Sequence, residues 1–280
     1  MFRTVLTSAV IAALGLMFAS IERSADAAND RFMKVMERGK VVVGVKADYK
    51  PWAFRDTDGN LVGMEIDMAQ DVADALGVEL ELVPVQSSNR MQFLEQGKID
   101  LMIATMSDRS DRRKMVGILE PNYYTSGTNL LARAGVVKEW EDLRDKPVCG
   151  KQGAFYNKVV AKRYGAKVVA FVNNAEAKQA LRDGKCIGWV YDDSSIGSDL
   201  ASGQWDGFEM PLNSEDDNPW GLAVPVEELD GIWGNFMAGM SYRWLVSGRL
   251  IELEEKWGIQ PTAFLKMQQE KLTPSRAHLK

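Results

Sequence analysis

The sequence predicts an α/β fold in which two doubly wound lobes are joined by two crossings of the chain. Short apolar runs rich in β-branched residues alternate with segments of helical periodicity. The order β-α-β-α-β occurs twice, in residues 40–105 and again in residues 146–192. Strand-like segments at 125–134 and 218–225 lie between and after these repeats. They would link the lobes twice and let them hinge around a cleft.

The first repeat begins with KVVVGV at residues 40–45, an apolar run that predicts a buried strand. Residues 63–77 predict a helix, because apolar side chains recur at spacings of three and four and Gly77 is a typical helix end. The elements that follow are a strand, a helix with Met91 and Leu94 on one face, and a strand, at 78–85, 88–98 and 99–105.

The second repeat predicts a strand, a helix, a strand, a helix and a strand, at 146–151, 155–165, 166–172, 174–185 and 186–192. Asn173 or Asn174 would cap the second of these helices.

The C-terminal segment 241–258 predicts further helices. If it packs on the first lobe, the chain crosses between the lobes twice. The expected first lobe is then 28–125 together with 221–280, and the expected second lobe is 126–220.

The composition excludes several classes of function. The chain has 280 residues, a formal net charge of -5 and a pI of about 5.2, so broad nucleic-acid binding, which needs a basic face, is not expected. Its one histidine, His278, lies almost at the C-terminus. A histidine-based triad or a multi-histidine metal site is therefore excluded. No cofactor is expected.

The N-terminus has the pattern of a secretory signal peptide. Arg3 precedes an uncharged, mostly apolar run at residues 4–20, and small residues at Ala25 and Ala27 suit signal peptidase. We expect residues 1–27 to be removed by cleavage after Ala27, which predicts an exported, soluble protein. The alternative is a membrane anchor, but the run is slightly short for a span and contains no cysteine to accept lipid.

The chain has two cysteines, Cys149 and Cys186. In an oxidising compartment such a pair is typical of a disulfide, and two buried free thiols are the alternative.

The stretch ATMSDRSDRRK at 104–114 is the main candidate for a site, because it directly follows a predicted buried strand. Open α/β sheets bind ligands at the carboxyl ends of their strands, which places Thr105 and Ser107 in the cleft. Ser110 is predicted to cap a helix whose first turn contains Arg112. Free backbone N–H groups, a hydroxyl and a guanidinium would bind a carboxylate or a phosphate. The alternative is a solvated helix start with surface ion pairs.

The chain resembles the periplasmic solute-binding proteins of amino-acid ABC transporters, the polar amino-acid binding family. The resemblance covers essentially the whole chain after the signal peptide. It rests on the order and spacing of YKPWAF (49–54), DGNLVGMEID (58–67), QGKIDLMIATMSDRSDRR (96–113), EPNYYTSG (120–127), VCGKQGAFYNK (148–158) and GKCIGWVYDDS (184–194). It implies a periplasmic monomer that binds an amino acid between its lobes and delivers it to an ABC permease in the membrane.

The resemblance also implies roles for residues on both lobes. Arg112 would grip the α-carboxylate of the ligand, supported by the Ser107 hydroxyl. Thr105 would meet the α-ammonium, and Asp192 would pair with it. This division suits a zwitterion, which is costly to bury unpaired. For Asp192 the alternative is an ordinary turn residue.

The same resemblance places Tyr49 and Trp52 in an aromatic wall over the ligand, with core packing as the alternative. One turn departs from the family, because Gly153-Ala154-Phe155-Tyr156 stands where relatives carry hydroxyl residues. Backbone N–H groups would still bind an anion there. Phe155 and Tyr156 would narrow the pocket or add a second aromatic wall.

Lys46 is the candidate for selecting the ligand. In relatives a basic residue at this position suits an acidic ligand, so Lys46 favours glutamate or aspartate by charge complementarity. The alternative is a surface lysine, and neutral amino acids or an organic acid also remain open as ligands. A subset of the family carries cysteines on the same two strands, which favours the Cys149–Cys186 disulfide.

Two other classes of function remain open beside a binding protein without catalysis. An enzyme on the same fold, such as a cyclohexadienyl dehydratase, needs a positioned acid or base. Glu65, Asp67 and Asp192 are the candidates, although Glu65 and Asp67 also fit an acidic pair at a helix N-terminus. The third class is an accessory or sensory protein that binds another organic acid and docks on a different partner.

Overall fold

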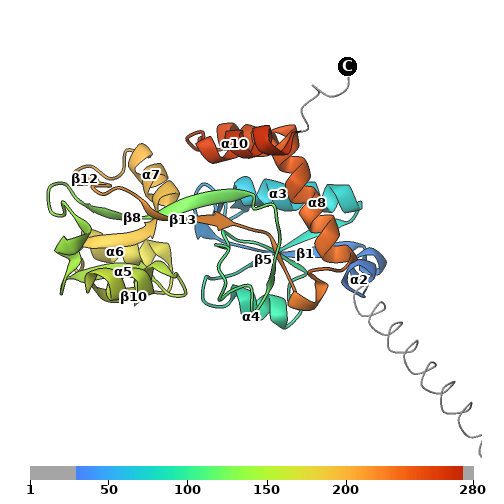
Figure 1. The fold of residues 1–280 in the computed structure, drawn as a ribbon, viewed down its shortest axis with the longest axis horizontal. Helices are drawn as coiled ribbons and strands as arrows, with labels where there is room; N and C mark the ends of the chain where they lie inside the picture. Colours follow the sequence, from blue (N-terminus) through green and yellow to red (C-terminus); the bar gives the residue numbers. More distant parts are fainter. Residues whose placement is uncertain (1–29, 274–280) are drawn as a thin grey trace, which may run out of the picture.

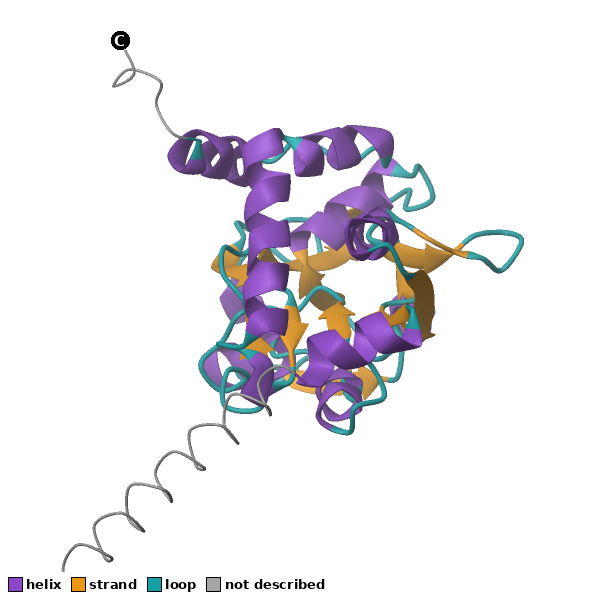
Figure 2. Ribbon diagram, turned by 90° about the vertical axis from the view of Figure 1, so that its right-hand side faces the viewer, coloured by secondary structure: helices purple, strands orange, loops and turns teal. Residues whose placement is uncertain are grey.

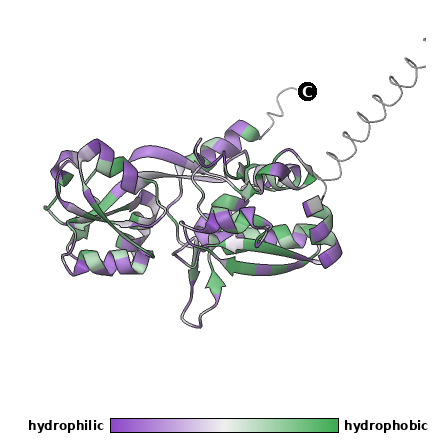
Figure 3. Cartoon of the chain, turned by 90° about the horizontal axis from the view of Figure 1, so that it is seen from below, coloured by the Kyte–Doolittle hydropathy of each residue, from purple (hydrophilic) through white to green (hydrophobic). Residues whose placement is uncertain are grey.

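The computed structural model describes residues 30–273 and places them in two α/β lobes that lie side by side (Figure 1). The predicted fold class is confirmed. In Figure 2 helices lie around the outside and strands occupy the interior, and in Figure 3 the strands at the centre of each lobe are largely hydrophobic. The predicted signal peptide, residues 1–27, and its cleavage site after Ala27 lie outside the described residues.

A five-stranded sheet with the order β5-β1-β6-β14-β7 forms the centre of the first lobe. Strand β1 of this sheet pairs in parallel with β5 on one side and β6 on the other. Val41, Val43 and Val45 of this strand are fully buried, as a parallel strand covered on both faces requires. The strands are β1 (Lys40–Val45), β5 (Glu79–Pro84), β6 (Leu101–Ile103), β7 (Gly117–Ile118) and β14 (Ala223–Val224). A second, three-stranded sheet of this lobe contains β2 (Asp48–Tyr49), β3 (Ala53–Arg55) and β4 (Leu61–Val62).

Helices cover the first lobe, and α3 occupies the range that its periodicity predicts. It ends at Gly77, which adopts the left-handed conformation with φ 67°. The helices are α2 (Asp30–Arg38), α3 (Met64–Leu76), α4 (Arg90–Glu95), a short 3-10 helix (Val226–Glu228), α8 (Ile232–Ser247), α9 (Arg249–Lys256) and α10 (Ala263–Leu272). Helix α4 and strand β6 are shorter than predicted, because turns take up residues at their ends.

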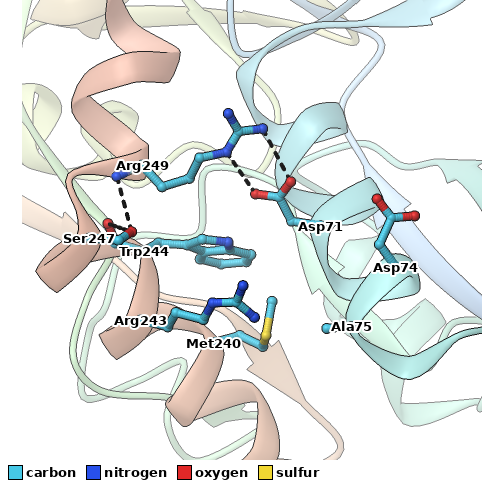
Figure 4. Close-up of a pocket in the computed structure, with 8 residues that line it drawn as sticks. All are labelled: Asp71, Asp74, Ala75, Met240, Arg243, Trp244, Ser247 and Arg249. Carbon is cyan, nitrogen blue, oxygen red and sulfur yellow. Dashed lines mark hydrogen bonds and ion pairs between the residues drawn. The ribbon is translucent and has the colours of Figure 1, made fainter.

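The C-terminal helices pack on the first lobe. Arg249 of α9 forms an ion pair with Asp71 of α3, with Nε 3.0 Å from Oδ2 (Figure 4). The Nζ of Lys256 lies 2.7 Å from Oδ2 of Asp67 on the same helix. The chain therefore returns to the first lobe after it has built the second.

The second lobe is built on a sheet with the order β10-β9-β11-β8-β12, in which β13 also pairs with β8. The strands are β8 (Tyr124–Arg133), β9 (Pro147–Lys151), β10 (Lys167–Phe171), β11 (Gly188–Asp192), β12 (Phe208–Glu209) and β13 (Glu215–Trp220). The helices are α5 (Tyr156–Tyr164), α6 (Asn174–Arg182), α7 (Asp193–Ala201) and a short 3-10 helix (Trp140–Leu143). Asn173 caps α6, and its side chain accepts a hydrogen bond from the backbone N–H of Glu176.

The two crossings between the lobes run along β8 and β13, which pair antiparallel with Trp220 opposite Tyr124. Both aromatic residues pack against Trp52 of the first lobe, with ring centroids 5.6 Å and 5.7 Å away. Directly after β13 the chain enters β14 in the sheet of the first lobe. This is the two-crossing hinge that the sequence predicts.

The helix predicted to begin at Ser110 is absent, and that prediction is wrong. Residues 110–115 form consecutive turns instead, in which the backbone N–H groups of Arg112 and Arg113 donate to the carbonyl of Arg109. The chain has only a few residues before it must extend into β7, where Val116 and Ile118 are buried. This segment therefore supplies no helix dipole to the cleft.

The predicted disulfide is confirmed. Cys149 and Cys186 are bonded, with their Cα atoms 5.5 Å apart, and the bond joins β9 to the segment that precedes β11. None of the helices within residues 30–273 is both long and apolar enough to cross a membrane.

The two lobes are in close contact at Gly153, in the turn between β9 and α5. A Cβ atom at this position would lie 2.5 Å from the backbone nitrogen of Ser88 and 2.7 Å from the carbonyl oxygen of Ser87, both on the first lobe. The backbone at Gly153 also has φ 75°, which favours glycine. The lobes can therefore close this far only because residue 153 is a glycine, which has no side chain.

We expect Gly153→Ala to hold the lobes apart, because its methyl group would press on backbone atoms of the other lobe. Small-angle X-ray scattering of the ligand-free protein should show a larger radius of gyration than the wild type. The matched control is Gly184→Ala, which shares the positive φ of 74° but has no atom within 4 Å of its Cβ position. Identical scattering from wild type and Gly153→Ala would contradict this account of closure.

Candidate functional site

A small cavity lies between the lobes, at the carboxyl ends of strands from both sheets. Its volume is about 10 Å³, which is room for about one water molecule, so the lobes are closed. The first lobe contributes residues that follow β5 and β6, and the second contributes the turn after β9 and the end of β11. The cavity is lined by Ser87, Arg90, Thr105, Ser107, Arg112, Ala154, Phe155, Tyr156, Tyr191 and Asp192.

Two buried arginines face this cavity. Arg112 is 6% exposed, and its Nη1 donates to the Ser107 carbonyl oxygen at 3.2 Å. Arg90 is 3% exposed, and its Nη1 donates to the carbonyl oxygens of Ala104 and Thr105. Within residues 30–273 neither guanidinium forms an ion pair with a carboxylate, and the Nε of Arg90 is buried without a partner. Burial, together with the nearby charge of Arg90, lowers the pKa of Arg112 to about 9.

Asp192 is the one carboxylate among the described residues that line the cavity. It ends β11 and accepts hydrogen bonds from two tyrosines: Tyr49 of the first lobe, at 2.5 Å, and Tyr156 of its own lobe. Burial raises the pKa of Asp192 to about 7, although the hydrogen bond from Tyr49 acts in the opposite direction. The carboxylate therefore sits at the junction of the two lobes in an environment that disfavours its charge.

Lys46 is fully buried, so the alternative of a surface lysine is wrong. Its Nζ donates to the Ser87 hydroxyl at 2.6 Å, and Ser87 in turn lines the cavity. Burial lowers the pKa of Lys46 well below its ordinary value, and the charges of Lys151 and Arg90 lower it further. Lys46 therefore does not line the cavity itself but contacts Ser87, a residue that does.

Tyr49 and Trp52 lie in an aromatic cluster at the hinge rather than along the cavity. Their rings are 5.2 Å apart, and Tyr49 also contacts Tyr191 and Trp220 at 5.3 Å and 6.0 Å. Of the two, only Tyr49 reaches the site, through its hydroxyl bond to Asp192.

Phe155 and Tyr156 line the cavity from the second lobe, in the turn where relatives carry hydroxyl residues. The Phe155 ring lies 4.4 Å from the guanidinium carbon of Arg109 and 5.8 Å from that of Arg112, so it stacks on cations of the opposite lobe. The aromatic rings of both residues thus form part of the cavity wall.

Thr105 lines the cavity, and Glu65 lies behind it and binds its backbone. Thr105 has φ 48°, an unusual conformation for a residue with a side chain, and its backbone N–H donates to Glu65 at 2.7 Å. Glu65 is fully buried and also accepts from the Tyr123 hydroxyl. Burial raises the pKa of Glu65, and these two hydrogen bonds oppose that rise. Glu65 therefore positions Thr105, whereas Asp67 faces away, toward Lys256.

Sequence reasoning missed Arg90. A signal for it exists, since Arg90 lies four residues before Leu94, on the face of α4 that the apolar pattern predicts to be buried. An arginine on such a face is either paired or functional. Within residues 30–273, no group of three or more His, Cys, Asp or Glu residues could hold a metal ion.

The chain is similar to several proteins of known role. It is 31% identical over 156 residues to the L-cystine-binding protein TcyJ of Escherichia coli, an alignment that covers 54% of this chain and 58% of that relative. It is 29% identical over 105 residues to the cyclohexadienyl dehydratase of Pseudomonas aeruginosa, covering 38% of this chain and 39% of the enzyme. The chain thus spans little more than half of the first relative and less of the second.

Among solved structures, holo ArgBP from T. maritima has a TM-score of 0.71 at 28% identity, covering 80% of this chain and 98% of that one. The sequence profile of the bacterial extracellular solute-binding proteins, family 3, matches residues 41–258. The closed pair of lobes, the strand-end site between them and this match over most of the chain lead to one conclusion: the protein belongs to the bacterial extracellular solute-binding proteins, family 3.

Proposed function

We propose that the protein captures an amino acid with an acidic side chain between its two lobes and delivers it to an ABC permease in the membrane. The observation that carries this proposal is the charge of the cavity wall. Arg90 and Arg112 are buried there without carboxylate partners among the described residues, and Asp192 is the one acidic group that faces them.

This inventory matches the charges of glutamate or aspartate. Such a ligand carries two carboxylates and one ammonium, and a buried charge is tolerated only when it is paired. The other nearby charges are less available to a ligand. Lys46 lies behind Ser87, donates to its hydroxyl and does not line the cavity. Lys151 pairs with Asp48 at 2.7 Å, and Glu65 accepts two hydrogen bonds. The two arginines and Asp192 are therefore the groups left for the ligand.

We assign the α-carboxylate to Arg112 and the Ser107 hydroxyl, and the side-chain carboxylate to Arg90. The ammonium would take the place of the Tyr156 hydroxyl on Asp192. Lys46, behind Ser87, would add positive potential next to the side-chain carboxylate, and an anion there would favour the charged form of this lysine. Arginine suits both carboxylates, because its planar fork can bind them through two parallel hydrogen bonds.

Binding would begin in an open state, since the closed cavity has no room for an amino acid. A ligand that touches both lobes stabilises the closed state through contacts that the open state does not offer. Arg90, Arg112 and Ser107 lie on one lobe and Asp192 on the other, so the ligand would bridge them.

Relatives differ in what they bind, which is why the ligand class rests on this site and not on similarity. TcyJ is an L-cystine-binding protein, and arginine-bound ArgBP has been solved. A cationic side chain would meet two unpaired guanidinium groups here and would be rejected by like-charge repulsion. Export to the periplasm, action as a monomer, independence of cofactors and an ABC permease as partner complete the proposal.

A catalytic role is the second candidate, because the chain is similar to a cyclohexadienyl dehydratase and Asp192 has a pKa of about 7, suited to acid–base chemistry. We expect the purified protein to leave prephenate unchanged over hours, as monitored by chromatography. Consumption of prephenate that Asp192→Asn abolishes would overturn the binding role.

Arg112→Met should abolish binding without weakening the ligand-free fold. Calorimetric titration with L-glutamate should show a Kd raised by at least about 100-fold, since one partner of a buried charge pair is lost. The melting temperature of the ligand-free variant should stay the same or rise, because a buried, unpaired cation is removed.

The matched control is the neighbouring Arg113→Met. Arg113 does not line the cavity and forms ion pairs with Asp108 and Glu120. This variant should lose a few degrees of melting temperature and keep its affinity for L-glutamate. A large loss of stability in Arg112→Met with little change in Kd would instead assign that arginine a structural role.

The affinity for L-glutamate should rise with pH and level off above pH 7, because only ionised Asp192 pairs with an ammonium. Below its pKa of about 7, Asp192 must release its proton before the ammonium can bind. The Kd should then increase by up to about tenfold per pH unit as the pH falls. Calorimetry in buffers of different ionisation enthalpy should detect the released proton.

The control for this pH dependence is Asp192→Asn, which should bind more weakly and with a Kd that no longer follows pH. A wild-type Kd that stays constant between about pH 5.5 and 8 would argue against contact between Asp192 and an ammonium.

A further inference from the structure

Two adjacent residues of strand β2 in the first lobe form polar contacts with the second lobe. Tyr49 reaches Asp192 inside the site, and Asp48 reaches Lys151 outside it. The Nζ of Lys151 lies 2.9 Å from Oδ1 and 2.7 Å from Oδ2 of Asp48, so both carboxylate oxygens are engaged. Asn174, at the start of α6, adds a backbone N–H bond to Oδ2 at 3.1 Å and a side-chain bond to the Asp48 carbonyl.

This ion pair is well shielded from water. The side chain of Lys151 is fully buried and that of Asp48 is 16% exposed. Burial by itself would raise the pKa of Asp48, but the charges of Lys151 and Lys46 outweigh it and hold the pKa below its ordinary value. Asp48 is therefore charged at neutral pH. Neither residue lines the ligand cavity.

We propose that Asp48 and Lys151 are positioning residues, which hold the two lobes closed and set part of the ligand affinity without touching the ligand. The pair joins β2 of the first lobe to the end of β9 in the second, so it exists only while the lobes are closed. Opening separates the two charges and hydrates each of them. The closed fraction of the ligand-free protein, and with it the apparent Kd, then depends on this pair.

The consequence of removing the carboxylate follows from the surroundings of Lys151. In Asp48→Asn the closed state would bury an unpaired ammonium close to Lys46, a second buried cation. The open state would hydrate the same ammonium at little cost. The equilibrium should therefore shift toward open lobes, whether or not a ligand is present.

Small-angle X-ray scattering of the ligand-free protein tests this shift, and calorimetry with L-glutamate tests its effect on affinity. Asp48→Asn should increase the radius of gyration and raise the Kd by about tenfold or more. The matched control is Asp67→Asn. Asp67 forms an ion pair of the same length, 2.7 Å, with Lys256, but both partners lie on the first lobe. This control should change neither the radius of gyration nor the Kd for L-glutamate.

A second substitution distinguishes the loss of this ion pair from a general destabilisation of the fold. Lys151→Met added to Asp48→Asn removes the unpaired ammonium, so the double variant should close again and bind more tightly than Asp48→Asn alone. Such non-additivity is expected only of groups that interact directly. Equal scattering and equal Kd in the wild type and Asp48→Asn, or a double variant that is more open than Asp48→Asn, would overturn the proposal.

The affinity arm rests on the proposed function, whereas the scattering arm does not. If the wild type gives no heat with L-glutamate while Asp48→Asn still expands, the positioning role stands and the assigned ligand is wrong. If L-glutamate binds and the scattering of the two proteins is the same, the ligand stands and the positioning role is wrong.

Discussion

Two guanidinium groups buried at the junction of the lobes are the constraint on which the rest of the site depends. Arg90 and Arg112 have lost most contact with water, and within residues 30–273 no carboxylate forms an ion pair with either guanidinium. Burying a cation in this way is costly unless an anion arrives. Other contacts hold the lobes closed, while the arginines keep a preference for an anionic ligand that bridges the lobes.

The acidic side chains near the site divide into those that stabilise the structure and one that is available to the ligand. Glu65 accepts hydrogen bonds from the Thr105 backbone N–H and the Tyr123 hydroxyl, and it holds the strained backbone at the end of β6 in place. Asp48 and Lys151 compensate each other across the lobes. Asp192 differs from Asp48 because its partners are neutral tyrosine hydroxyls, which a ligand ammonium can replace, and it differs from Glu65 because it lines the cavity. Pairing, rather than the number of charges, is what identifies the binding groups.

Much of the fold and part of the site could be predicted from the sequence. Periodicity predicted β1 and α3, and strand-end placement predicted that Thr105 and Ser107 face the cleft. The family resemblance added Arg112 and Asp192, and all four line one cavity. Properties that depend on tertiary contacts could not be predicted. The helix expected at Ser110 is replaced by turns because β7 begins too soon, and Lys46 is buried by residues far away in the sequence. The role of Asp48 appears only when the lobes close on each other.

A crystal structure of the protein grown with L-glutamate would test the central claim most directly. We expect one glutamate between the lobes, with its α-carboxylate on Arg112, its side-chain carboxylate on Arg90 and its ammonium on Asp192 in place of the Tyr156 hydroxyl. The Asp48–Lys151 ion pair should remain intact beside it. A ligand that leaves either arginine without an anion, or that leaves Tyr156 on Asp192, would contradict the assignment of these charges.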